Sequence, residues 1–113
     1  MSDVIVIGSD EHGLTELINQ TVLSATHLPG EPIGADLVEA GIEAASALVI
    51  TNASLATTVS VAKERNDGLT VVFYSRGRLP PYASRQADLA IDPALVDPDE
   101  VVDAVVDRLT TTG

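Results

Sequence analysis

The residues best placed to bind a phosphate group follow the first apolar run of the chain, Val4–Ile7. Two glycines bound the next six residues, and a helix-like run follows, as in loops that present backbone N–H groups to phosphate oxygens. The dinucleotide-binding pattern, however, needs glycine at position 10, where this chain has Asp10. At an effective dielectric of about 20, a carboxylate roughly 4 Å from a phosphate charge costs about 4 kcal/mol. Two interpretations stay open: Asp10 caps the helix, or the loop binds a ligand through Gly8, Ser9, Asp10, His12 and Gly13.

Two further polar groups follow apolar runs that read as buried strands. Thr51 and Asn52 end the run 47–51, and Ser75 and Arg76 follow the run 69–74. Ligands of open α/β sheets bind beyond the carboxyl ends of the strands, so a hydroxyl, an amide or an arginine there could contact a ribose or phosphate. The alternatives are an N-cap for a helix starting near Ser54, and arginines that neutralise nearby carboxylates.

Catalysis and metal binding have little support in the sequence. The chain has no cysteine, its serines lack the G-x-S-x-G elbow, and no lysine is placed as a base. His12 and His27 are far apart and lack the spacing of metal ligands, so His12 is read as an exposed loop residue. We therefore expect no catalytic residues, no metal and no enzymatic activity.

The elements that would position these residues alternate between strand and helix. Strands are expected at 4–7, 24–28, 47–51, 69–74 and 88–91. Helices are expected at 14–19, 35–40, 52–64, 82–86 and 98–109, with the second stopped by Gly41. This alternation predicts a single α/β domain over residues 1–113: a small, doubly wound, mostly parallel, Rossmann-like sheet of about five strands.

Charge limits the classes of partner. Seventeen acidic residues against six basic ones give a net charge of −11, which repels nucleic acid and anionic lipid. No apolar run reaches the roughly 20 residues that span a bilayer. We therefore expect a cytoplasmic protein that binds no nucleic acid and does not insert into membranes. An acidic, lysine-poor composition also suggests halophilic adaptation, because strong salt shortens the Debye length to about 3 Å.

From residue 34 onward the sequence resembles the nucleotide-binding domain of potassium-transport regulators, the RCK or Trk-type N-terminal (TrkA-N) family. The likeness lies in an "EAGI" corner before a strand, an "A-K" helix, a strand followed by arginine, a "P-x-Y" segment and a close that resembles the family's "G-A-D-x-V-x-x-P". These lie within residues 34–51, 57–64, 71–76, 81–83 and 87–93. The resemblance implies that the run 47–51 is the fourth strand of that fold, and that the ligand is NAD or an adenine nucleotide. By the same likeness a crossover helix is missing after the second strand.

Two functions follow. The first is a regulatory, ligand-sensing module that binds a nucleotide or another small polar molecule where the strand order reverses. The alternative is an interaction or oligomerisation domain that has lost the pocket. A missing helix would leave an apolar sheet face uncovered, and such a surface usually meets a partner. We therefore expect a homo-oligomer, by default a dimer, or a protein partner, with the final helix or the sheet edge in the contact.

Overall fold

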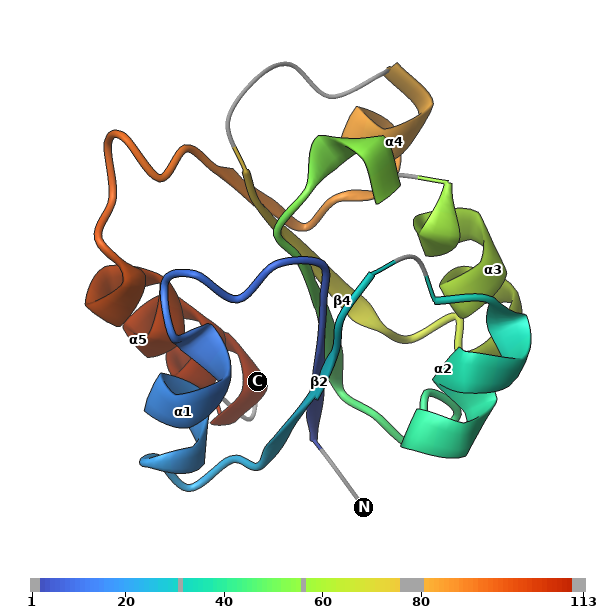
Figure 1. Cartoon of the computed structure of the whole chain (residues 1–113), viewed down its shortest axis with the longest axis horizontal. Helices are drawn as coiled ribbons and strands as arrows, with labels where there is room; N and C mark the ends of the chain where they lie inside the picture. The colour runs from blue at the N-terminus through green and yellow to red at the C-terminus, as the bar shows by residue number, and fades with distance from the viewer. Residues whose placement is uncertain (1–2, 31, 56, 76–80, 111–113) are drawn as a thin grey trace.

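The chain forms a parallel sheet between two layers of helices (Figure 1). The computed structural model describes residues 3–30, 32–55, 57–75 and 81–110. The strands are β1 (Val4–Ile7), β2 (Ala25–Leu28), β3 (Ala47–Ile50), β4 (Thr70–Tyr74) and β5 (Leu89–Ile91). They lie in the order β2-β1-β3-β4-β5, and every neighbouring pair is parallel. The predicted doubly wound α/β fold of about five strands is confirmed.

The helices match the sequence-based bounds except in one place. They are α1 (Leu14–Asn19), α2 (Gly34–Ala40), the 3-10 turn η1 (Ala53–Leu55), α3 (Thr58–Arg65), α4 (Pro81–Gln86) and α5 (Pro98–Thr110). The single helix expected over 52–64 is wrong, because the segment divides into η1 and α3. The Asn52 carboxamide holds the backbone in a local turn at Ser54, and asparagine favours such turns over a continuing helix.

The two central strands are buried on both faces, which explains their nearly continuous apolar sequences. Side chains alternate across a strand, so Ile5 and Ile7 of β1 pack in one core cluster and Val4 and Val6 in the other. The first cluster includes apolar residues of α2 and α3, and the second includes those of α1 and α5. Figure 1 shows these helix pairs on opposite sides of the sheet.

Both faces of the sheet are therefore covered, which corrects the expectation of a missing helix and an open apolar face. The chain from β2 to β3 contains α2, whose Leu37 is buried in the first cluster. On the other face α5 buries Val101, Val102 and Val105 against the sheet and α1. The apolar face of α5 is thus used within the chain and is not available to a second copy. A homodimer stays a prediction, but not through that face.

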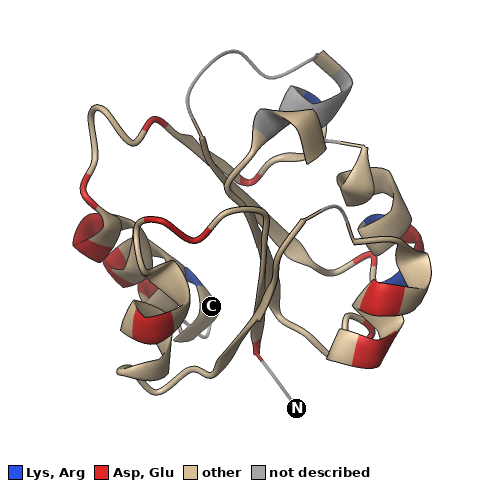
Figure 2. Ribbon diagram, viewed as in Figure 1, with Lys and Arg blue, Asp and Glu red and all other residues tan. Residues whose placement is uncertain are grey.

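Charge is spread over both helical layers rather than gathered at one site. Figure 2 shows Asp and Glu on the helices and loops of both layers. Among the described residues, no helix has the length and apolar character that a membrane crossing requires.

Candidate functional site

The loop after β1 is closed by its own acidic side chain. Asp10 accepts hydrogen bonds from the backbone N–H groups of Leu14 (2.8 Å, Oδ1) and Thr15 (3.1 Å, Oδ2). These are first-turn N–H groups of α1, which have no partner within the helix. Asp10 therefore caps α1 as expected, although the N-cap residue itself is Gly13. Its carboxylate occupies the place where a diphosphate would accept the same hydrogen bonds, so the phosphate-binding geometry is satisfied internally.

Gly8 makes room for a close contact between the loops after β1 and β3. Its backbone has φ +96°, and a Cβ atom there would lie 2.6 Å from Thr51 Oγ1. The Thr51 hydroxyl lies 2.5 Å from the carbonyl oxygen of Ser9 and 3.1 Å from that of Ile7, and donates to one of them. Gly13 also has a positive φ, +70°, just before α1 begins. Gly8 and Thr51 therefore keep the loops after β1 and β3 together at the point where the strand order reverses.

Asn52 ends the same strand and is also engaged in local structure. Its Oδ1 accepts hydrogen bonds from the Ser54 backbone N–H (3.0 Å) and from Ser54 Oγ (2.8 Å). The capping interpretation of Asn52 is thus confirmed, although the element it starts is η1 and not a long helix. Both hydrogen bonds use the carbonyl oxygen of this exposed side chain.

A cavity of about 250 Å³ lies at the carboxyl ends of the strands, above the β1/β3 switch point. Four loops contribute to it, which brings together several predicted residues; the lining is Glu11, His12, Thr51, Asn52, Tyr74, Ser75 and Pro93. Gly8, Ser9, Asp10 and Gly13 are not in its lining and act in the turn. Arg76, and with it the expected arginine cluster, lies outside the described residues.

Tyr74 and Pro93 were missed by the sequence reasoning. The signal for Tyr74 was available, because it is the last residue of a strand predicted to be buried. Its hydroxyl donates to the carbonyl oxygen of Val96 (2.7 Å), which ties β4 to the loop before α5. Burial raises the pKa of the Tyr74 phenol above its usual value of 10.0, and the carboxylates of Asp97, Asp92 and Glu100 raise it further.

The two histidines make contacts at the carboxyl edge of the sheet. His12 is not a freely exposed loop residue as expected: its ring packs edge-on against Tyr74, with centroids 5.1 Å apart, and Nε2 lies 3.7 Å from Glu11 Oε1. His27 Nε2 lies 2.6 Å from the carbonyl oxygen of Gly8, so that nitrogen carries a proton and donates it. Within the described part of the chain, no group of three or more acidic, histidine or cysteine residues could hold a metal ion.

The strand order and the position of this cavity define a flavodoxin-like doubly wound α/β domain, in which ligand sites form between β1 and β3. The chain belongs to DUF7126, a family of unknown function, which it matches over residues 4–105. No curated protein matches the sequence.

Solved structures of the same fold include response regulators. An atypical orphan response regulator, reported with a phosphorylation-independent regulatory mechanism, has a TM-score of 0.71 at 19% identity, covering 97% of this chain and 98% of its own. An orphan response regulator of H. pylori has a TM-score of 0.69 at 17% identity, covering 96% and 98%. A protein ascribed to pilus assembly in Burkholderia thailandensis has a TM-score of 0.69 at 17% identity, covering 99% and 100%. At these identities the likeness shows the fold alone.

The resemblance to RCK and TrkA-N domains is therefore wrong, and with it the nucleotide-binding assignment. The structural neighbours are response-regulator-like, and the run 47–51 forms the third strand of five and not the fourth strand that the resemblance implied. The dinucleotide fold has the strand order 3-2-1-4-5-6, whereas this sheet is 2-1-3-4-5. The motifs behind that resemblance are short segments that any parallel α/β unit can contain, so they do not identify a family.

Proposed function

We propose that this chain is a non-catalytic regulatory module of the response-regulator receiver type, which acts through protein contacts and without accepting a phosphoryl group. The observation that carries this proposal is the chemistry of its switch-point edge. Thr51 and Asn52, at the end of the central strand β3, are a hydroxyl and an amide already engaged in hydrogen bonds. Neither is a carboxylate that could form an acyl phosphate.

The nearby acidic residues do not provide an alternative phosphoryl acceptor. The Asp10 carboxylate accepts two backbone hydrogen bonds of α1, and Glu11, with its side chain 76% exposed, lies beside His12. Phosphoryl transfer relies on a divalent metal to neutralise developing charge, and the described residues contain no cluster suited to one. The similar atypical regulator, described as phosphorylation-independent, supports the same interpretation.

The test is exposure of the full chain to acetyl phosphate and Mg²⁺, with a phosphorylatable response regulator treated in parallel as the positive control. We expect no phosphoryl adduct by intact mass spectrometry and no change in melting temperature or solution mass. A stable adduct on Glu11 or Asp10, accompanied by a change in melting temperature, would refute the proposal. A rise in melting temperature with Mg²⁺ alone, which KCl at the same ionic strength does not reproduce, would contradict the absence of a metal site among the described residues.

A further inference from the structure

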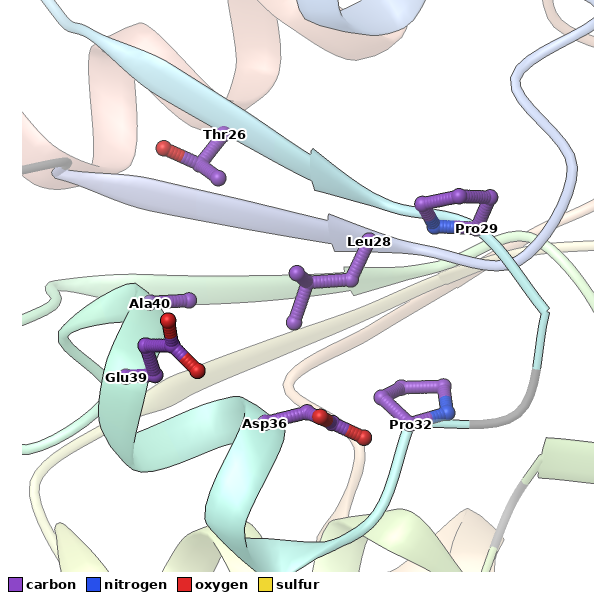
Figure 3. A pocket seen from close by; sticks show the side chains of 7 residues that line it. All are labelled: Thr26, Leu28, Pro29, Pro32, Asp36, Glu39 and Ala40. Atoms are coloured by element: carbon purple, nitrogen blue, oxygen red, sulfur yellow. The ribbon is translucent and has the colours of Figure 1, made fainter.

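A second cavity, away from the switch point, lies between the edge strand β2 and helix α2. All four residues of β2 are only partly buried, whereas the neighbouring β1 is fully buried. The space left there is about 410 Å³, within the roughly 300–1,000 Å³ of ligand pockets. We call it the β2–α2 groove, and Figure 3 shows its lining: Thr26, Leu28, Pro29, Pro32, Asp36, Glu39 and Ala40.

The groove combines an apolar floor with an uncompensated negative wall. Asp36 and Glu39 are three residues apart on α2 and so share one side of the helix. Asp36 Oδ2 accepts a hydrogen bond from the Ile33 backbone N–H (2.9 Å). The Glu39 carboxylate makes no hydrogen bond or ion pair within the described residues, and no basic side chain lines the groove. A cationic group is the ligand that this wall would attract.

An apolar surface continues from the groove. A cavity of about 290 Å³ shares Pro32 with it and includes Ile33 and Val61 in its lining. Ile33 is 66% exposed and Val61 37% exposed, so apolar side chains face solvent directly beside the acidic wall. A small amine would leave this surface uncovered. A peptide carrying a basic residue next to an apolar one would cover both.

Two other occupants fit less well. A second copy of the chain has a net charge of −11 and would bring acidic residues against an acidic wall. Strand addition to the free edge of β2 is obstructed at Ala25, because the Asn19 carboxamide donates to its carbonyl oxygen (3.2 Å) and accepts from its N–H (2.8 Å). Asn19 thus takes the place that a neighbouring peptide group would occupy.

We infer that the β2–α2 groove is a docking site for a basic segment of a partner protein. A lysine or arginine of that segment reaches Glu39 and Asp36, while its alkyl stem lies on Leu28 and Pro32. An adjoining apolar residue packs against Ile33 and Val61. The inference rests on the proposed function only in that the module acts through protein contacts.

The experiment titrates the isotope-labelled full chain, at about 0.15 M salt, where the Debye length is about 8 Å, with a capped peptide that alternates arginine and leucine. We expect saturable NMR shifts at the amides of Thr26, Leu28 and Ala40. Glu39→Lys should weaken binding about tenfold, since it replaces an attraction by a repulsion. The matched control is Asp103→Lys, which makes the same change of charge on an exposed position of α5, in the other helical layer; it should change the affinity less than twofold.

Four results would overturn the inference. The peptide fails to saturate, its shifts map outside the groove, both variants weaken it equally, or spermidine alone produces the same shifts with the same affinity. The last result would identify a small amine, not a protein segment, as the occupant. None of these outcomes bears on the acetyl phosphate test, and a phosphoryl adduct in that test leaves the peptide result intact, so the two proposals fail separately.

Discussion

Replacing Asp10 by alanine tests the central feature of the switch-point edge. The substitution removes both hydrogen bonds that the carboxylate accepts from the first turn of α1, at Leu14 and Thr15. Loss of such a cap costs about 1–2 kcal/mol. Unfolding entropy of about 2.1 cal/mol/K per residue, over 113 residues, gives about 0.24 kcal/mol/K, so the melting temperature should fall by about 4–8 °C.

The assay is thermal and urea unfolding followed by circular dichroism, with Glu11→Ala as the matched control. Glu11 is the next residue along the chain, loses the same charge, and is 76% exposed, so its replacement should change the free energy of unfolding by less than about 0.5 kcal/mol. Asp10→Asn keeps an oxygen acceptor and should fall between the two. If Asp10→Ala is as stable as the parent chain, or no less stable than Glu11→Ala, the capping argument is wrong.

Three other perturbations have defined outcomes. Gly8→Ala should lower the free energy of unfolding by about 2 kcal/mol or more, because φ is +96° and the new Cβ would lie 2.6 Å from Thr51 Oγ1. Thr51→Ala in the same chain should recover part of that loss in urea unfolding, and no recovery would place the strain elsewhere. The raised pKa of Tyr74 means that the unfolded state loses its proton first, so stability is full below about pH 10 and declines above it. Tyr74→Phe should flatten that decline in melts from about pH 9 to about pH 11, and at neutral pH should cost about 1 kcal/mol for the bond to the Val96 carbonyl; an unchanged alkaline slope would contradict this. Molar KCl should raise the melting temperature by screening the net charge of −11, and a fall would count against halophilic adaptation.

The local elements could be predicted from the sequence because each has its own signal. Val4–Ile7 is an unbroken β-branched run, and Gly41, with φ +95°, ends α2 where the sequence placed a stop. The capping of α1 by Asp10 followed from its position before a helical run. Each of these features depends on contacts within a few residues, and a single sequence carries that information.

The strand order could not be predicted from the sequence in the same way. An alternating strand and helix pattern is compatible with several parallel sheets, and no local signal says on which side of β1 the third strand pairs. β3 aligns Ala47 with Val4 and Ile50 with Ile7, a choice made by packing between segments over 40 residues apart. The short motifs of residues 34–93 therefore supported a fold class correctly and a family wrongly.

Part of the switch-point cavity could be predicted from the sequence, for a physical reason. Parallel strands bring their carboxyl ends to one edge, so Thr51, Asn52 and Ser75 could be placed together from the sequence, and all three line the cavity. Tyr74 is the last residue of β4 and could have been placed there on the same ground, whereas Pro93 joins them only through the packing of the loop after β5. The β2–α2 groove had no signal at all, because it exists where an edge strand is left partly covered by its neighbouring helix.

The hydrogen bonds of the two sites lead to different expectations for ligand binding. At the switch point, Asp10 and Asn52 accept hydrogen bonds from the segments that follow them, and Thr51 and His27 bond to the loop after β1. A ligand using those atoms must first break bonds worth about 1 kcal/mol each. In the β2–α2 groove, Glu39 has no such bond within the described residues, so a cation that pairs with its carboxylate has no hydrogen bond of Glu39 to break. A regulatory contact should therefore form more readily at the groove than at the switch-point edge, where Thr51 joins the loops after β1 and β3.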